Sequence, residues 1–254
     1  MKLKRPFYYS QAKYYDLIIP SKAKEYCAYI DEKIQSLGFN KQAKILDAGC
    51  GTGTYSAELA KIGYNVIGVD LSDELINLAI KKNSFNNLRF EIADLKNISS
   101  DNQFNIILCR GVLNDILNDE DRDMILSNFS NNLLPGGILI FDVREWENTK
   151  IKNMRNKVYE KEVKIDGGSL KFTSISELDN ANKILKVKET HLITQNKREE
   201  IYEYDFRMRC WTIDEIEERL VKNNFTDIVF YNDYSFSKDD ITNDKITVVA
   251  RKRI

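Results

Sequence analysis

Three glycines at alternate positions, Gly49, Gly51 and Gly53, follow an apolar run that ends in the acid Asp47. The run is typical of the end of a buried strand, and the apolar spacing over residues 54–62 predicts a helix. The glycines therefore lie in a strand-to-helix turn. There they permit backbone conformations that a side chain would forbid, and they let a ligand approach the main chain and the free N–H groups of the helix.

A second acid, Asp70, ends the next apolar run, residues 65–69, and follows Gly53 by seventeen positions. This spacing is typical of a βαβ unit in which an acid at the tip of the second strand accepts hydrogen bonds from both hydroxyls of a ribose. The two motifs together predict an adenosine-containing cofactor.

The residues around the turn narrow the type of cofactor. A dinucleotide fingerprint needs a third small residue that packs the helix on the strand, and Thr54 or Ser56 would have to fill that position. Asp47 would repel a pyrophosphate, whereas it suits a cofactor that carries a positive charge. A nicotinamide dehydrogenase is therefore disfavoured.

The sequence Asp-Ala-Gly-Cys-Gly-Thr-Gly at residues 47–53, followed by Asp70, resembles motif I and its sequel in class I S-adenosylmethionine-dependent methyltransferases. The resemblance continues in order: Asp94 ends a third strand pattern, Cys109 ends a fourth, and a Leu-x-Pro-Gly-Gly turn at 133–137 enters a fifth. It implies an α/β fold with a Rossmann-like, seven-stranded, mostly parallel sheet and helices on both faces. It also implies S-adenosylmethionine as methyl donor and S-adenosylhomocysteine as product.

The resemblance also implies which residues bind the cofactor. In this family the acid after the third strand and a neighbouring backbone N–H hold the adenine. Each motif has a simpler interpretation, because the glycines could form an ordinary turn and Asp70 or Asp94 could cap a helix, as Ser72 is expected to do. The implied cofactor-binding residues are Tyr15, Asp47, Gly49, Cys50, Gly51, Gly53, Asp70, Leu71, Asp94, Leu95, Cys109 and Arg110.

The chain is expected to have three parts. Residues 1–40 are rich in tyrosines and carry a Tyr-Asp pair at Tyr15, which in small-molecule methyltransferases belongs to a helical lid; an amphipathic helix packed on the sheet is the alternative. Residues 41–146 and 210–254 would form the cofactor-binding core. Residues 147–209 alternate like antiparallel strands, and glycine N-methyltransferase-like and amino-sugar N-methyltransferase-like enzymes carry such an inserted sheet over the acceptor site.

Three residues are candidates for the catalytic base that an amine or phenol acceptor would need. Asp115 follows the fourth strand, at the carboxyl end where open α/β sheets bind ligands. His191 is the single histidine and falls in an alternating strand, and Tyr14 belongs to the lid region. Asp115 could instead cap a helix or lie in solvent, and a histidine in a strand is more often structural.

Contacts to the acceptor are expected from Asn114, next to Asp115, and from Arg207 and Arg209, which close the inserted segment. The arginines could bind an acidic acceptor. Salt bridges with neighbouring acids would explain them equally well, the nearest in sequence being Glu199, Glu200 and Glu203.

Composition excludes several classes of protein. The 254 residues, 43% of them hydrophobic, suffice for one sizeable α/β domain with an elaboration. A formal net charge of −1 offers no basic field for nucleic acid or an anionic membrane. No apolar stretch approaches the roughly 18 residues that span a bilayer, and the basic N-terminus lacks the apolar core of a signal peptide. The four cysteines lack metal-ligand or disulfide spacing. A cytoplasmic protein without a metal is expected.

The predicted function follows from these motifs and absences. The Asn-Pro-Pro-Tyr or Asp-Pro-Pro-Tyr motif of nucleic-acid amino-methyltransferases does not follow the fourth strand. The sequence therefore predicts S-adenosylmethionine-dependent methyl transfer, by in-line displacement, to a nitrogen or oxygen of a small molecule. A non-catalytic S-adenosylmethionine-binding or regulatory protein is the alternative. Two subunits could pair as a homodimer through an exposed edge of the inserted sheet.

Overall fold

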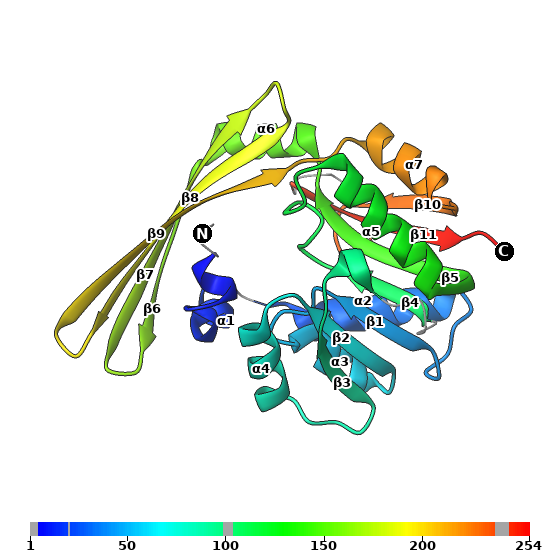
Figure 1. The fold of residues 1–254 in the computed structure, drawn as a ribbon, viewed down its shortest axis with the longest axis horizontal. Helices are drawn as coiled ribbons and strands as arrows, with labels where there is room; N and C mark the ends of the chain where they lie inside the picture. The colour runs from blue at the N-terminus through cyan, green and yellow to red at the C-terminus, as the bar shows by residue number, and fades with distance from the viewer. Residues whose placement is uncertain (1–4, 20, 99–103, 237–243) are drawn as a thin grey trace.

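The computed structural model describes residues 5–19, 21–98, 104–236 and 244–254, which form two sheets (Figure 1). The larger sheet has seven strands in the order β10-β11-β5-β4-β1-β2-β3. Among these described strands, β11 runs antiparallel to both of its neighbours, β5 and β10, and the other neighbouring pairs are parallel. The predicted seven-stranded, mostly parallel sheet is confirmed. The strands are β1 (Lys44–Ala48), β2 (Asn65–Asp70), β3 (Leu88–Ile92), β4 (Phe104–Cys109), β5 (Leu133–Arg144), β10 (Phe225–Tyr231) and β11 (Lys245–Lys252).

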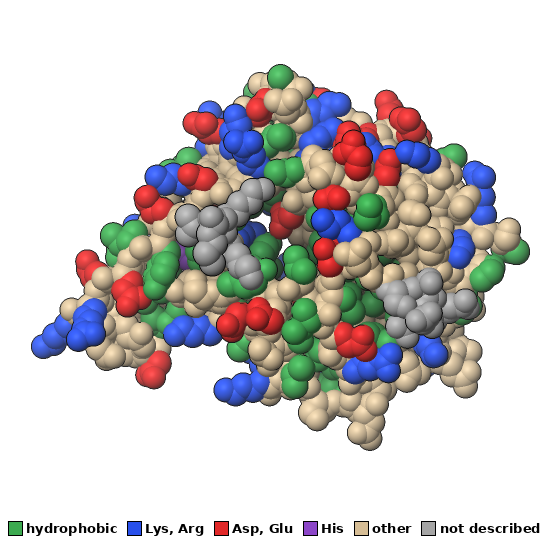
Figure 2. Space-filling view, viewed as in Figure 1, with side chains coloured by type: hydrophobic (Ala, Val, Ile, Leu, Met, Phe, Trp, Pro, Cys, Tyr) green, Lys and Arg blue, Asp and Glu red, His purple; other side chains and the backbone are tan. Residues whose placement is uncertain are grey.

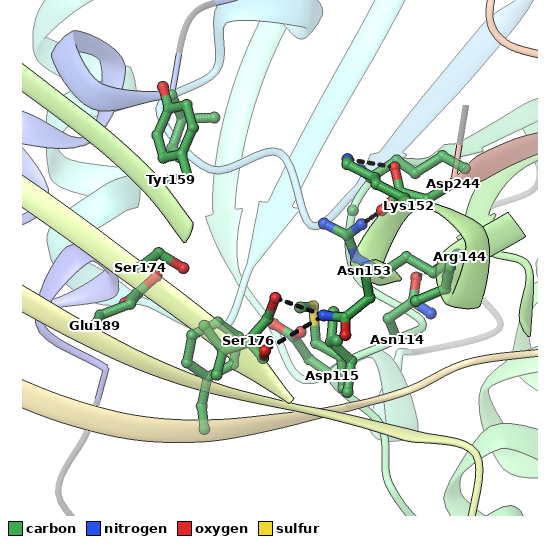
Figure 3. Close-up of a pocket in the computed structure, with 18 of the residues that line it drawn as sticks. Asn114, Asp115, Arg144, Lys152, Asn153, Tyr159, Ser174, Ser176, Glu189 and Asp244 are labelled. Atoms are coloured by element: carbon green, nitrogen blue, oxygen red, sulfur yellow. Dashed lines mark hydrogen bonds and ion pairs between the residues drawn. The ribbon is translucent and has the colours of Figure 1, made fainter. Parts of the chain in front are cut away.

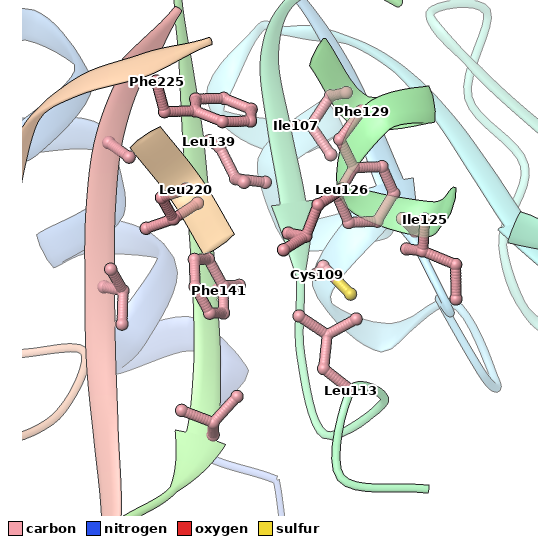
Figure 4. Packing of buried hydrophobic residues seen from close by; sticks show 14 of the residues in the cluster. Ile107, Cys109, Leu113, Ile125, Leu126, Phe129, Leu139, Phe141, Leu220 and Phe225 are labelled. Atoms are coloured by element: carbon pink, nitrogen blue, oxygen red, sulfur yellow. The ribbon is translucent and has the colours of Figure 1, made fainter. Parts of the chain in front are cut away.

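Helices cover both faces of this sheet, because side chains along a buried strand alternate between its faces. In β4, Ile107 and Cys109 pack with the helices α5 and α7, whereas Ile106 and Leu108 pack with α2 and α3. Figure 4 shows the first of these two cores, with Leu126 of α5 among its central side chains. The helices are α2 (Ala23–Ser36), α3 (Thr54–Ile62), α4 (Asp73–Lys82), α5 (Asp119–Asn132), α6 (Trp146–Arg155) and α7 (Ile213–Lys222).

The predicted cap at Ser72 is confirmed, and α7 begins in the same way. The Ser72 hydroxyl accepts the N–H of Leu75 at 3.1 Å and caps α4. The Thr212 hydroxyl accepts the N–H of Glu215 at 3.3 Å and caps α7. Such caps satisfy N–H groups that have no partner inside the helix.

The second sheet has four antiparallel strands in the order β6-β7-β8-β9, and they lie between β5 and β10 in the chain. Consecutive strands are hydrogen-bonded neighbours, so the sheet is a series of hairpins. In Figure 1 these long strands extend away from the seven-stranded sheet. Their bounds are β6 (Val158–Ile165), β7 (Gly168–Asp179), β8 (Ile184–Gln195) and β9 (Arg198–Arg209).

The N-terminal segment, residues 5–19, lies between the two sheets (Figure 1). It is helical in three short pieces rather than one long helix: η1 (Pro6–Tyr8), η2 (Ala12–Tyr14) and α1 (Tyr15–Ile18). Ile19 is extended, as expected for a residue that precedes a proline. The buried side chains of the N-terminal segment, Phe7, Tyr14 and Ile18, pack on Phe172 of the four-stranded sheet. Among the described residues, no helix is long and apolar enough to cross a membrane.

Candidate functional site

The glycine turn and Asp70 form one hydrogen-bonded unit at the ends of β1 and β2. The N–H of Gly51 donates to Asp70 Oδ2 at 2.9 Å, and the N–H of Ser72 donates to Oδ1 at 2.9 Å. Gly51 has a φ of +56°, and a Cβ built on it would meet nothing within 4 Å. A Cβ on Gly49, by contrast, would collide with Val112. The turn therefore leaves open space in front of a carboxylate that backbone donors hold in place, which fits a ribose diol.

Asp47 lies behind this turn and is almost fully buried. Its Oδ2 accepts the Ser56 hydroxyl at 2.5 Å. Burial raises the pKa of Asp47 to about 6, although the Ser56 hydrogen bond and the charge of Arg110 act in the opposite direction. Arg110 stacks on Tyr55, with the guanidinium carbon 3.5 Å from the ring centroid. Its Nε is buried and has no hydrogen-bond partner among the described residues, so it can donate to a ligand.

The ends of β2 and β3 present an apolar surface beside the Asp70 carboxylate. Leu71, which follows Asp70 in the chain, is 61% exposed. The Asp94 carboxylate accepts the N–H of Lys96 at 3.0 Å and caps η3 (Leu95–Asn97). The capping interpretation of Asp94 is thus observed, and its second oxygen can still accept a hydrogen bond. An adenine ring would find apolar contacts and an acceptor here.

The N-terminal segment is attached directly to the glycine turn. The Thr52 hydroxyl donates to Asp16 Oδ1 at 2.8 Å. Lys82 of α4 donates to the other oxygen of Asp16 at 2.6 Å, and the Ser72 hydroxyl donates to the backbone oxygen of Tyr8. The segment therefore covers the edge of the seven-stranded sheet where β1 and β2 end.

A cavity of about 360 Å³ lies between the N-terminal segment, the four-stranded sheet and the strand ends (Figure 3). Tyr15 of the N-terminal segment and Gly111, Asn114 and Asp115 after β4 line one part of it. The remaining walls come from β5, α6, β6–β9 and the start of β11. Their polar and charged lining residues include Arg144, Lys152, Asn153, Tyr159, Ser174, Ser176, Glu189, Asp244 and Lys245.

A chain of polar contacts crosses the cavity from the four-stranded sheet to Asp115. Arg5 donates to both carboxylate oxygens of Glu189, at 2.6 and 3.2 Å, and to the Tyr8 hydroxyl at 2.6 Å. The Tyr8 hydroxyl in turn donates to Asp115 Oδ2 at 3.1 Å. Burial raises the pKa of Asp115, while Arg5 and the Tyr8 hydrogen bond oppose that rise. Burial also raises the pKa of Tyr8 well above its usual value, so Tyr8 remains a donor.

The structure brings some of the sequence-predicted acceptor residues into the cavity and separates others from it. Asn114 lines the cavity and is fixed by two backbone bonds, donating to Arg209 O at 2.8 Å and accepting from Arg144 N at 2.9 Å. Arg209 lies outside the cavity lining and pairs with Glu215 at 3.2 Å. Arg207 is exposed on β9 and does not line the cavity. The acceptor roles of these three residues stay predictions.

His191 and Tyr14, two of the candidate bases, are buried away from the cavity lining. The His191 ring lies 4.1 Å from the centroid of Phe7 and 5.3 Å from that of Phe172. Its Nε2 is 3.8 Å from Glu189 Oε2. Tyr14 belongs to the same buried cluster. Their catalytic roles also stay predictions, whereas Asp115 does line the cavity.

Sequence reasoning missed several residues of this cavity. Arg144 ends β5 at the carboxyl edge of the sheet, a position that could have singled it out. Glu189 lies two residues before His191 on β8, so the alternation of the strand could have placed the two on one face. Arg5 and Tyr8 gave no sequence signal, because their partners lie more than 100 positions away.

Comparisons with known proteins agree with this geometry. A family model described as a methyltransferase domain matches residues 39–205. The chain is 29% identical over 143 residues to the glycine N-methyltransferase of Mus musculus, which covers 50% of this chain and 48% of that protein. The chain spans about half the length of the curated relatives it matches.

Two solved structures share the whole fold at low identity. An S-adenosylmethionine-dependent methyltransferase from Clostridium acetobutylicum ATCC 824 superposes with a TM-score of 0.79 at 20% identity, over 96% of this chain and 98% of that one. S-adenosylmethionine-bound CalS10, an amino pentose methyltransferase from Micromonospora echinaspora, gives 0.72 at 16% identity, over 99% of each chain. Because the family model covers most of the chain and the glycine turn fits the cofactor of this class, the chain belongs to the S-adenosylmethionine-dependent methyltransferase family.

Proposed function

We propose that this protein transfers the methyl group of S-adenosylmethionine to a nitrogen or oxygen atom of a small molecule bound in the cavity. The observation that supports this most strongly is the position of the cavity. Gly111, Asn114 and Asp115, which line it, follow β4, and β4 is the parallel neighbour of β1, after which the glycine turn begins. A cofactor at the turn and an acceptor in the cavity would therefore meet at one edge of the sheet.

In this proposal residues at the ends of β1, β2 and β3 would hold the cofactor. Asp70 would accept the ribose hydroxyls, because its carboxylate is already oriented by two backbone N–H groups. Leu71 and Leu95 would contact the faces of the adenine, and Asp94 would accept from its edge. Arg110 would donate to the carboxylate of the cofactor through its unpaired Nε.

S-adenosylmethionine supplies a methyl group on a positively charged sulfur. The nucleophilic atom of the acceptor would form a bond to the methyl carbon while the carbon–sulfur bond breaks, so residues that align the two molecules and exclude water would supply much of the acceleration. An amine acceptor also loses one proton. We assign that proton to Asp115, because it lines the cavity and burial raises its pKa. His191 and Tyr14 do not line the cavity.

The remaining parts of the chain would enclose the acceptor. The N-terminal segment would act as the lid, and β6–β9, inserted into the core between β5 and β10, would form the outer wall. A cavity of about 360 Å³ suits a small molecule. Figure 2 shows acidic and basic side chains mixed over one face of the molecule, without a basic patch of the kind that binds nucleic acid.

Calorimetry on the purified protein tests the cofactor assignment. We expect S-adenosylmethionine and S-adenosylhomocysteine to bind and NAD to give no heat. Asp70→Ala should weaken binding by about 1 to 3 kcal/mol, because it removes a charged hydrogen-bond acceptor. Asp73→Ala, an exposed acid three positions away, is the matched control and should bind as the unchanged protein does. Equal affinities for all three proteins would contradict the role of Asp70.

Catalysis needs its own measurement. The protein would be incubated with methyl-labelled S-adenosylmethionine and a metabolite extract, and the labelled product identified by mass spectrometry. We expect one small labelled product, and slower labelling with Asp115→Asn, which keeps the shape of the side chain but cannot take the proton. Tight cofactor binding without any labelled product would favour the non-catalytic alternative.

A further inference from the structure

The acidic and basic side chains that line the cavity differ in how far they are exposed to it. Of the three acids that line it in the described part of the chain, Glu189 and Asp244 have side chains only 2% and 4% exposed. The cations that pair with Asp244 are more accessible: the Arg144 side chain is 21% exposed and that of Lys152 is 57% exposed. Asp115 is the cavity acid that retains intermediate exposure. A ligand would therefore meet cations over most of the charged wall.

Three of these cations gather on one side of the cavity, where β5, α6 and β11 meet: Arg144, Lys152 and Lys245. We call them the cationic shelf. Arg144 and Lys152 share a single carboxylate, Asp244, which Lys152 contacts at 2.7 Å. Lys245 contacts the buried Asp142 at 3.4 Å. Figure 3 shows Arg144, Lys152 and Asp244 together on this side, away from Glu189 and Ser174.

Among the described residues, Arg144 and Lys152 together carry one more positive charge than Asp244, the single carboxylate that they share. The Asp142 carboxylate is also engaged by the N–H of Gly111 at 2.6 Å. An excess cation in a partly desolvated wall attracts an anion more strongly than the same charge would in water. The shelf is close to Asp115, because Asn114, its chain neighbour, accepts a hydrogen bond from the backbone of Arg144 at 2.9 Å.

Resting on the proposed function, we propose that the methyl acceptor is a short molecule with a nucleophilic amine at one end and a carboxylate or phosphate at the other. The anionic group binds the shelf, chiefly Lys152 and Arg144. The amine lies beside Asp115, the accessible carboxylate. The two ends have opposite charges, which matches the arrangement of the wall and fixes which end of the acceptor faces the methyl donor.

Calorimetry on protein saturated with S-adenosylhomocysteine tests this, with ethanolamine, O-phosphoethanolamine, β-alanine and inorganic phosphate as probes. At least one of the two anionic amines should bind about tenfold or more tightly than ethanolamine, because a charge-assisted hydrogen bond is gained. That advantage should decrease with added salt. Stronger binding of O-phosphoethanolamine or of β-alanine identifies the anion as phosphate or carboxylate.

The variant Lys152→Gln should abolish the advantage of the anionic amines, and Lys152→Arg should retain it. Lys171→Gln is the matched control: this lysine, 48% exposed, is on β7 outside the cavity lining and should have no effect. Two results would overturn the inference in a protein that still binds S-adenosylhomocysteine. One is equal affinity for ethanolamine and both anionic amines, and the other is no binding of any anionic probe. Failure of S-adenosylhomocysteine itself to bind would instead overturn the proposed function.

Discussion

At the scale of single residues, three aspartates of the site differ in what surrounds them. Asp70 is held by backbone N–H groups, Asp47 is buried beneath the turn with one hydroxyl donor, and Asp115 faces the cavity beside Tyr8. Burial raises the pKa of each, and it raises that of Asp47 to about 6. The same side chain can therefore bind a diol, balance a cation or take a proton, according to its environment.

The raised pKa of Asp47 predicts a pH dependence of cofactor binding. A cationic cofactor favours the ionised carboxylate, so below pH about 6 binding must also remove a proton from Asp47. Affinity should then decrease by up to about tenfold for each pH unit. The stability of the free protein should depend on pH in the opposite direction. Asp47 binds a proton more tightly in the folded than in the unfolded state, so its contribution to the free energy of unfolding is lost as the pH rises from about 4 to 6.

Calorimetric titrations with S-adenosylhomocysteine and S-adenosylmethionine between pH 5 and pH 8 would measure this. The dependence should be clearer for S-adenosylmethionine, which carries the sulfonium charge. Asp47→Asn should bind more weakly at neutral pH and show a flat profile below pH about 6. If Asp47→Asn kept the full pH dependence of cofactor binding, that dependence would belong to another ionisable group.

At the scale of elements, the N-terminal segment is attached to both sheets. Asp16 accepts from Thr52 and Lys82 on the side of the seven-stranded sheet, and Arg5 pairs with Glu189 on the side of the four-stranded sheet. The lysine of β6, Lys161, also donates to the backbone oxygen of Leu17 at 2.8 Å. The segment thus joins two sheets that otherwise meet along the walls of the cavity.

The pair between Arg5 and Glu189 should contribute measurably to this attachment. A double-mutant cycle with Arg5→Gln and Glu189→Gln is expected to give a coupling energy of about 1 to 3 kcal/mol, because both side chains are largely buried and bidentate. Chemical denaturation would measure it, and limited proteolysis of the N-terminal segment should accelerate in each single variant. The exposed pair of Lys188 and Glu203 is the control, with an expected coupling below about 1 kcal/mol.

The sequence predicted the elements that obey local rules and missed the contacts that do not. The glycine turn, Asp70 and the cap at Ser72 depend on residues within a few positions of one another or on the spacing of one βαβ unit. The seven-stranded, mostly parallel sheet followed from the family resemblance. Arg5 could not be paired with Glu189 from sequence, since 184 positions separate them and many acids were available. Nor could alternation alone show whether His191 faced the cavity or an aromatic cluster.

At the scale of the whole molecule, two sheets with different organisation are combined in one chain. The four-stranded sheet contains only hairpins between consecutive strands. The seven-stranded sheet is discontinuous in sequence, because β10 and β11 follow the hairpins in the chain. There β11 pairs with β5 along seven residue pairs, from Arg144↔Lys245 to Ile138↔Arg251. Closing that pairing brings together two strands that are separated by 100 residues of the chain.

This topology predicts an order of folding. Hairpins form on a faster timescale than pairings between distant segments. Pulsed hydrogen exchange during refolding should therefore show amides of β7 and β8 protected before those of β5 and β11. Simultaneous protection of the two sheets, or earlier protection of β11, would contradict it.

The late arrival of β11 also matters while the chain is being synthesised. Until residues 245–252 leave the ribosome, β5 has a free hydrogen-bonding edge, and its central residues Ile138, Leu139, Ile140 and Phe141 are apolar. Such an edge can pair with other nascent chains. Translation through the 100 residues that separate the two strands is thus the interval in which this protein is most exposed to aggregation, and a chaperone that shields an apolar strand would act then.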